Sequence, residues 1–438
     1  MPELTERIAA QVDAVGNELI LFLQNLVQLP SLPGREQKAQ RFVADKLRAL
    51  GLRVDVVSSE FDELKDHPAF SDDGVPFRER LNVIGRWPGT GRSLDAVPAL
   101  SLILNGHMDV VPTGSEARWS GSPWSGAIRN GKLYGRGSCD MKAGVTANIF
   151  AVQALQTLGF SPAADVLVES VIGEESGGVG TLTTIVKGFQ ADAAIITEPT
   201  RLHLCPVQSG ALSFRVRVAG RAIHACMKPY GVSAMEKFYL VLQAVQDLER
   251  KRHVEYRNPL YEDSNNIAPV NFGTIRAGDW PSTVPDELVA EGRFGVLPGE
   301  PVRAARAAMA AALEQASAHD DWLREHPPAL EWFEGQFESG QTPRDSPIVQ
   351  AVSAAHTQTL GQAPVVQGVT YGSDLRLFTN HANIPAVLYG PGDVANAHTV
   401  DEYVELEEVV AATKVVALTL CRWCGGGFDG STLRKGRR

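Results

Sequence analysis

Cysteine is scarce in this sequence, and long apolar runs are missing. The five cysteines are scattered and odd in number, which excludes a disulfide framework and favours a reducing compartment. No apolar stretch approaches the roughly 20 residues that a membrane-spanning helix needs. The first residues, "MPELTERIAAQVDAV", are amphipathic and charged and lack the apolar core of a signal peptide. We therefore expect a cytoplasmic protein with no membrane partner.

Positive charge is also in short supply. The 438 residues include 41 Lys and Arg against 51 Asp and Glu, which gives a formal net charge of −10. This acidic balance argues against nucleic acid as a partner. Hydrophobic residues make up 44% and charged residues 21%, as in folded globular proteins. The length predicts two or three compact units.

Strand-like and helix-like segments alternate through the first half of the chain. Patterns of buried strands occur at "LNVIGRW", "ALSLILNG", "DVLVESVIG" and "DAAIITEP", with helical patterns at 142–158 and 180–187. This alternation predicts an α/β fold with a doubly wound, mostly parallel sheet. Apolar spacing from Ile8 to Leu26 predicts one amphipathic helix. The polar segment Phe61–Arg80 predicts a long surface excursion.

The pattern changes after about Ser209. An alternating strand, a helix at 233–250, two strands, a helix at 301–316 and a last strand "ALEWFEGQF" give the order β-α-β-β-α-β, which is ferredoxin-like. The α/β pattern then resumes. The sequence therefore predicts a domain formed by 1–209 and 341–425, an inserted domain at 210–340, and a disordered tail at 426–438.

Side chains that ligate metals cluster where predicted strands end. Five strand ends or adjoining loops carry them: His107 with Asp109, Asp140, Glu174 with Glu175, Glu198, and His398. In an open α/β sheet, ligands bind at the carboxyl ends of the strands. Convergence there would bury several like charges, which requires a neutralising cation. The alternative for His107 and Asp109 alone is a core histidine or a polar turn.

The number of these groups suits two metal ions. Two histidines and three carboxylates, with one aspartate shared, make two three-ligand sites that leave room for water. Two such metals activate one water and polarise a carbonyl. Asp109 would orient His107, and the Glu174-Glu175 doublet leaves one residue for a general base. The ligand types suit zinc, with cobalt and manganese as alternatives.

These residues lie in motifs that occur together in one known family. The motifs are "NGHMDVVP", "LYGRGSCDMKAG", "GEESGG", "TEPT" and "NAHTVDEYV". In this order they resemble the M20 metallopeptidase family, in its acetylornithine deacetylase and succinyl-diaminopimelate desuccinylase-like branch. The segments "VAGRAIHACMKPYGVSAMEK" and "GTIRAGDWPSTVPDE" are similar too, so the resemblance covers nearly the whole chain. It implies a sheet of the zinc-peptidase type with an inserted lid and dimerisation domain.

The resemblance also implies a role for each motif residue. One metal would be bound by His107, Asp140 and Glu198, and the other by Asp140, Glu175 and His398. Glu174 would be the general base, and Asp109 would orient a ligand. One departure is that Ser138-Cys139 precede Asp140, where the family usually has Ala-Ser. Cys139 is therefore either a small packed residue or an extra soft ligand.

Four residues of the inserted domain and its neighbourhood complete the expected site. His224 would reach the partner subunit's active site and stabilise the oxyanion, unless it is a solvated loop histidine. Arg293 resembles a lid arginine that contacts a substrate carboxylate. Asp374 and Arg376, in "VTYGSDLRLF", are candidates for substrate contact, with helix capping by Ser373 or Asp374 as the alternative.

The sequence therefore predicts a homodimeric two-metal amidohydrolase. Its substrate would be a small N-acyl amino acid or N-acyl amine, with a linear amide C–N bond cleaved as in acetylornithine deacetylase. One alternative is a formylaminopyrimidine deformylase of thiamin salvage, because 61–80 and "GDWPSTVPDE" resemble that longer branch. Another is a dipeptidase or carboxypeptidase. A third alternative is a binding protein that has lost catalysis, although the chain keeps every residue of the expected centre.

Overall fold

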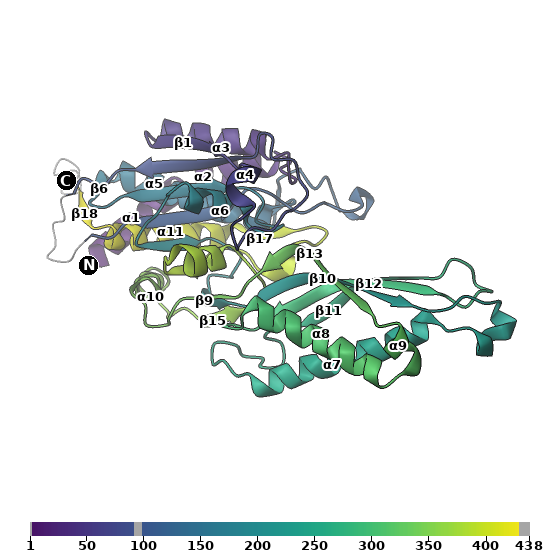
Figure 1. Ribbon diagram of the computed structural model, residues 1–438. Coiled ribbons are helices and arrows are strands. Elements are labelled where there is room, and N and C mark those ends of the chain that lie inside the picture. Colours follow the sequence, from purple (N-terminus) through teal and green to yellow (C-terminus); the bar gives the residue numbers. More distant parts are fainter. Residues whose placement is uncertain (1, 92–98, 429–438) are drawn as a thin grey trace. The chain divides into compact units, whose positions relative to one another are not determined.

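The structure, a computed structural model, describes residues 2–91 and 99–428. The chain divides into two compact units, and Figure 1 shows the elements of each in sequence colours. The first unit comprises Met1–Pro206, Gln341–Gln367 and Leu377–Arg438, and the second Val207–Gly340 and Gly368–Arg376. None of the helices in the described part of the chain combines the length and apolar character needed to cross a membrane.

The first unit is built on a large sheet. Among the described residues it has nine strands in the order β1-β2-β7-β3-β8-β16-β9-β14, with β15 paired to β9. Their bounds are β1 Arg53–Ser58, β2 Leu81–Trp87, β3 Leu102–His107, β7 Val166–Val171, β8 Ala193–Ile196, β9 Leu204–Gln208, β14 Gly340–Gln341, β15 Val366–Val369 and β16 Ala386–Leu388. The central strands β7, β3, β8 and β16 run parallel, and β1, β2 and β9 pair antiparallel. The fold is mixed α/β, as the alternating patterns predict.

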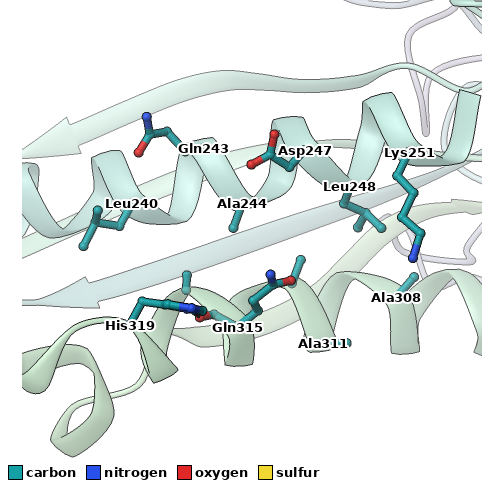
Figure 2. A pocket seen from close by; sticks show the side chains of 12 residues that line it. Leu240, Gln243, Ala244, Asp247, Leu248, Lys251, Ala308, Ala311, Gln315 and His319 are labelled. Atoms are coloured by element: carbon teal, nitrogen blue, oxygen red, sulfur yellow. Dashed lines mark hydrogen bonds between the residues drawn. The ribbon is translucent and has the colours of Figure 1, made fainter. Parts of the chain in front are cut away.

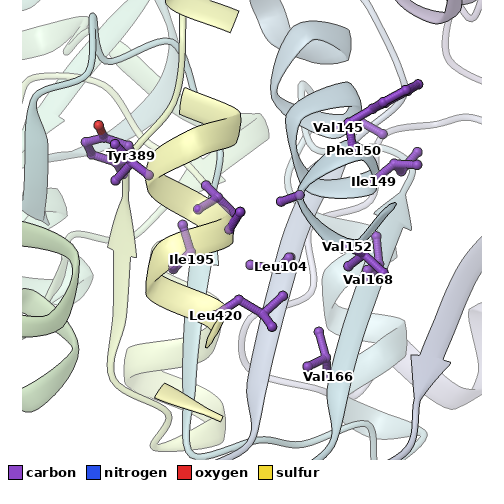
Figure 3. Close-up of a cluster of buried hydrophobic side chains, with 14 of the residues drawn as sticks. Leu104, Val145, Ile149, Phe150, Val152, Val166, Val168, Ile195, Tyr389 and Leu420 are labelled. Atoms are coloured by element: carbon purple, nitrogen blue, oxygen red, sulfur yellow. The ribbon is translucent and has the colours of Figure 1, made fainter. Parts of the chain in front are cut away.

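Burial explains the apolar runs of the central strands. Every residue of β3, β7 and β8 is buried, as expected for parallel strands covered on both faces. Leu104 of β3 is flanked by Val168 of β7 and Ile195 of β8. Helix α5 (Ala143–Thr157) packs on β3 and β7, and α11 (Leu406–Trp423) packs along α5. Figure 3 shows their side chains meeting those of the strands.

The remaining elements of the first unit cover and extend this sheet. The helices are α1 Pro2–Ala14, α2 Gly16–Val27, α3 Gln37–Ala49, α4 Phe61–Leu64, α6 Val179–Val186 and α10 Pro347–Leu360. The small strands are β4 Ala127–Arg129, β5 Lys132–Tyr134, β6 Phe160–Pro162, β17 Tyr403–Glu405 and β18 Gly426–Phe428. The single N-terminal helix expected from Ile8 to Leu26 is two helices. Val15 leaves the helical conformation just before Gly16, a residue that weakens a helix.

Two further expectations need correction. Gly426–Phe428, expected in a disordered tail, form strand β18 against β6, with the ring of Phe428 5.3 Å from that of Phe160. The rest of the expected tail, 429–438, lies outside the described residues. Segment 61–80 is not merely a surface excursion either, because Leu64 and Arg80 are fully buried. Arg80 also forms a buried ion pair with Asp73 of the same segment, at 2.7 Å.

The second unit contains a four-stranded antiparallel sheet in the order β11-β12-β10-β13. Its strands are β10 Gly210–Ala219, β11 Val270–Ala277, β12 Glu287–Val296 and β13 Ala329–Phe337, and its helices α7 Ala234–Glu255, α8 Val302–Ala318 and α9 Asp321–Glu325. Burial in β10 alternates, so one face of this sheet is covered and the other is exposed. Figure 2 shows a pocket between α7 and α8, with Leu240, Leu248 and Ala308 in its lining.

Candidate metal centre

Three of the candidate segments begin where parallel strands of the large sheet end. His107 is the last residue of β3, Glu174 and Glu175 follow β7, and Glu198 follows β8. Because neighbouring parallel strands end at the same edge, these side chains are brought together there. His107, Glu174 and Glu198 are also buried.

Asp140 and His398 approach the same place from irregular backbone. Asp140 lies in the turn Ser138–Lys142 ahead of α5, where its φ of −119° and ψ of 98° interrupt the helical path. A cis peptide bond joins Asp140 to Met141. His398 follows β16 after a loop and has a φ of 59°. Neither position is part of a regular strand end, so their convergence depends on the turns themselves.

The distances show how closely the imidazoles and carboxylates approach. His107 Nε2 lies 3.0 Å from Asp140 Oδ1, and 3.9 Å from both Glu174 Oε2 and Glu198 Oε1. His398 Nε2 lies 3.0 Å from Glu175 Oε2 and 3.5 Å from Asp140 Oδ2. The structure thus brings together all five residues expected to be metal ligands.

The donor set fits divalent metal ions. Ligand atoms of His107, Glu174 and Glu198 all lie within 4.8 Å of one another, and so do those of His107, Asp140 and Glu175. Imidazole nitrogens and carboxylate oxygens are the donors that zinc sites use. The geometry also places Glu174, expected as the base, close enough to His107 and Glu198 to be a ligand. Metal analysis of Glu174→Gln and Glu175→Ala proteins distinguishes the two roles.

Electrostatics at the centre favour added positive charge. Burial alone would lower the pKa of His107, but Asp140 and Glu198 hold it well above its usual range. Hydrogen bonds with Asp140 and Glu175 raise the pKa of His398 to about 10. Burial and the charge of Asp140 raise the pKa of Glu175. The carboxylates therefore favour protons on the two imidazoles, and a divalent cation supplies the same positive charge while releasing them.

Asp109 has a different contact from the one expected. The Nδ1–H of His107 donates to the backbone carbonyl oxygen of Asp109 at 2.9 Å, while the carboxylate is 3.7 Å from that nitrogen. The carboxylate accepts hydrogen bonds from the backbone N–H groups of Glu174 at 3.2 Å and Glu175 at 3.1 Å. Asp109 therefore holds the glutamate turn with its side chain and contacts the imidazole mainly through its backbone.

Sequence reasoning missed a buried ion pair beside Asp140. Arg136 donates to Glu402 at 2.6 Å, with side chains 3% and 1% exposed. The other carboxylate oxygen of Glu402 accepts from the N–H groups of Cys139 at 2.9 Å and Asp140 at 3.1 Å. Arg136 lies in the motif "LYGRGSCDMKAG" and Glu402 in "NAHTVDEYV". The position of the Glu402 carboxylate four residues after His398 is a sequence signal for this pair.

We expect Arg136→Met to destabilise the first unit strongly. The change leaves the Glu402 carboxylate buried without its ion-pair partner, which typically costs about 3–5 kcal/mol. Urea denaturation followed by tryptophan fluorescence measures the loss. The control is Lys132→Met, which breaks the more exposed Lys132–Glu405 pair on the neighbouring β5–β17 ladder and should change little. Equal effects of the two changes would contradict the expectation.

Cys139 is a packed residue in this structure. Its side chain is buried, and the thiol donates to the carbonyl oxygen of Asp393 at 3.3 Å. Burial raises the pKa of the Cys139 thiol well above its usual range, so the thiolate that a metal ligand requires is disfavoured. Of the two readings of Cys139, the structure favours the packed one.

The other four candidate residues belong to the second unit. His224 is exposed, and its Nδ1 accepts from the N–H of Cys226 at 3.2 Å. Arg293, on β12, donates to the carbonyl oxygen of Thr370 at 2.8 Å, and burial lowers the pKa of its guanidinium. This donation occupies part of the group that was expected to bind a substrate carboxylate.

Asp374 and Arg376 are buried within the second unit, at 1% and 0% exposure. The guanidinium of Arg376 lies 3.9 Å from Glu338 and 5.3 Å from the ring centre of Phe337. The neighbouring Ser373 accepts from the N–H of Leu375 at 3.2 Å, which is a local turn contact of the kind named as the alternative. Substrate contact by these residues stays a prediction.

Comparison with known proteins identifies similar sequences and folds. The family model described as Peptidase family M20/M25/M40 matches residues 103–422. The N-formyl-4-amino-5-aminomethyl-2-methylpyrimidine deformylase of Bacillus subtilis (strain 168) is 29% identical over 438 residues, covering 94% of this chain and 96% of that protein. An acetylornithine deacetylase of Myxococcus xanthus is 28% identical over 373 residues, covering 82% of this chain and 87% of that protein.

A solved structure shares the fold. It is a dinuclear metal-binding peptidase of the M20 family from Bacillus subtilis, with a TM-score of 0.60 and 16% sequence identity. The match covers 94% of this chain and 99% of that one. At this identity the likeness concerns the fold.

Proposed function

The chain belongs to the peptidase family M20/M25/M40, and from that premise we propose that this hydrolase of amide bonds removes a formyl group from a small amine of the aminopyrimidine type. The observation that supports this substrate class is the extent of similarity to the Bacillus subtilis deformylase. An alignment that covers 94% of this chain must extend well into the segment ahead of residue 103, where the family match begins. The acetylornithine deacetylase is aligned over a smaller share, 82%.

The proposed centre holds two divalent ions, zinc by ligand type. His107, Asp140 and Glu198 would hold one, and Asp140, Glu175 and His398 the other. When bound, such ions polarise the amide carbonyl and lower the pKa of water. Of the carboxylates of the centre, this assignment leaves Glu174 and Asp109 unused. Asp109 accepts from the backbone N–H groups of the glutamate turn, which leaves Glu174 for proton transfer.

Glu174 carries the proton in this mechanism. Its Oε2 accepts a proton from the attacking water and donates it to the leaving nitrogen when the amide C–N bond breaks. Asp109 keeps Glu174 in place through the bond to its backbone N–H. Burial at the end of β7 excludes bulk water from this carboxylate, which suits a group that must exchange protons with one water and one amine.

The finer features of the assembly are also part of the proposal. The second unit acts as a ferredoxin-like lid and dimerisation domain; its β-α-β-β-α-β order and its sheet order β11-β12-β10-β13 support this. His224 of the partner subunit stabilises the oxyanion, and its exposed position on the second unit suits such a contact. The protein acts in the cytoplasm, where its five free cysteines stay reduced.

A substrate panel tests this function. Zinc-loaded protein is offered N-formyl, N-acetyl and N-succinyl derivatives of an aminomethylpyrimidine, ornithine and benzylamine, together with dipeptides. We expect the N-formyl aminomethylpyrimidine to have the highest kcat/KM, and chelation of the metal to abolish turnover. Preference for N-acetyl ornithine would replace the deformylase proposal by a deacetylase, and preference for dipeptides by a peptidase. The Glu174→Gln protein serves as the control for contaminating activity.

A further inference from the structure

We propose that residues 71–80, called the clamp segment below, position the Glu174–Glu175 turn through Asp73 and Arg80. This inference rests on the proposed function, in which Glu174 moves the proton and Glu175 binds metal. Asp73 and Arg80 are positioning residues in this account, because they contact the turn and not the substrate. The clamp segment is part of Phe61–Arg80, whose polar sequence predicts a surface excursion.

Asp73 links the clamp segment to the turn by a direct hydrogen bond. Its Oδ2 accepts from the hydroxyl of Ser176 at 3.1 Å, and Ser176 directly follows Glu175. The same oxygen accepts from Nη1 of Arg80 at 2.7 Å. The side chains of Arg80 and Asp73 are 0% and 3% exposed. A charge-assisted hydrogen bond that is shielded from water in this way holds the Asp73 carboxylate firmly. The hydrogen bond from Ser176 to this carboxylate therefore restrains the position of Ser176.

Close packing on two glycines supports the same role. Gly173, just before Glu174, has a φ of 69°, and a β-carbon added there would lie 2.7 Å from Nη2 of Arg80. Gly177, just after Ser176, has a φ of 132°, and a β-carbon there would lie 2.8 Å from the side chain of Ser71. The clamp segment therefore touches the turn at both ends.

The turn is also held by Asp109. Asp109 accepts from the N–H groups of Glu174 and Glu175, while the clamp segment contacts Gly173, Ser176 and Gly177. Glycines at both ends make this turn intrinsically flexible. Its two carboxylates also lie close to those of Asp140 and Glu198, and like charges repel. The contacts with Asp109 and with the clamp segment restrain the turn against both effects.

The test removes the link between the clamp segment and the turn without touching a ligand. Ser176→Ala deletes the hydroxyl, Asp73→Asn removes the charge that pairs with Arg80, and Ser176→Thr retains a hydroxyl. Zinc affinity is measured by competition with a chelating dye, and kcat and KM with the best substrate of the panel. Partners of this kind are typically worth about 10–100-fold in metal affinity or activity.

We expect Ser176→Ala and Asp73→Asn to weaken zinc binding and lower kcat within that range, with KM nearly unchanged. Ser176→Thr, which keeps a hydroxyl, should retain both the zinc affinity and the kcat of the wild-type protein. The double variant should lose no more than the worse single one, because both changes break the same link. Asp72→Asn is the matched control: Asp72 is the exposed neighbour, bonded only locally to the N–H of Gly74 among the contacts recorded.

The outcomes separate this inference from the proposed function. If wild-type protein hydrolyses none of the panel while the variants still lose zinc affinity and Ser176→Thr regains it, the substrate proposal fails and the clamp stands. If Ser176→Ala and Asp73→Asn both keep the zinc affinity and kcat of the wild-type protein, the proposed role of the clamp segment is overturned. A lower unfolding midpoint with unchanged affinity and kcat overturns it as well, since Asp73 would then serve stability alone. The proposal is also overturned if Asp72→Asn lowers zinc affinity and kcat as much as Asp73→Asn does.

Discussion

Glu174→Gln is expected to lower kcat by about 10²–10⁴-fold, the usual worth of general acid–base help, while both metal sites stay filled. Glutamine keeps the shape and the hydrogen bonds of Glu174 but cannot accept a proton. Because Glu174 is proposed to serve both the attack and the departure of the amine, we expect at least this loss. KM should change little, since the missing interaction belongs to the transition state.

The neighbouring variant provides the control. Glu175→Ala should lose one metal and activity together, because Glu175 is proposed as a ligand and lies 3.0 Å from His398. Elemental analysis of both proteins distinguishes the roles. The structure makes this comparison necessary, because Glu174 is as close to His107 as Glu198 is. A Glu174→Gln protein with an empty metal site, beside a Glu175→Gln protein with both filled, would show that the roles are exchanged.

Activity should return when two inactive chains are mixed. His224→Ala and Glu174→Ala are each expected to be inactive as homodimers, because every site then lacks one essential group. In a heterodimer, one of the two sites takes both intact residues. Random exchange of a twofold dimer should therefore restore about one quarter of wild-type activity. The measurement is turnover after mixing, with exchange followed by a mass-tagged chain.

Two controls make this experiment decisive. His319→Ala alters another exposed histidine of the second unit and should leave activity unchanged. Light scattering establishes whether the active species is larger than the 47.2 kDa chain. Confirmed exchange without returning activity, or a fully active monomer, would refute the role of His224 across the dimer.

The sheet was predictable because its central strands carry one strong signal. Strands such as β3 and β8 are covered on both faces, so the apolar runs at 102–104 and 193–196 stand out in the sequence. The metal-type side chains were predictable for a related reason. A carboxylate or imidazole that ends such a run has few structural explanations, and the sheet brings the ends of its parallel strands together.

The contacts that support the residues of the candidate centre were not predictable, because the two partners of each contact are far apart in sequence. Asp73 and Ser176 are 103 residues apart, and Arg136 and Glu402 are 266 apart. In a sequence, a buried polar residue looks like a surface residue until its partner is known, so the pattern of Phe61–Arg80 predicts a surface excursion. The helix break at Val15 has no signal in the apolar spacing, because that spacing continues across it.

The Arg136–Glu402 pair has a consequence for the order in which the protein matures on the ribosome. It joins the turn that carries Asp140 to a segment only four residues beyond His398, near the end of the chain. The whole second unit is synthesised between these two partners. The nascent chain therefore carries Asp140 in an unfinished turn until residue 402 has emerged. The proposed ligand His398 is also synthesised after the whole second unit, so metal loading of the proposed centre would be a late step in maturation.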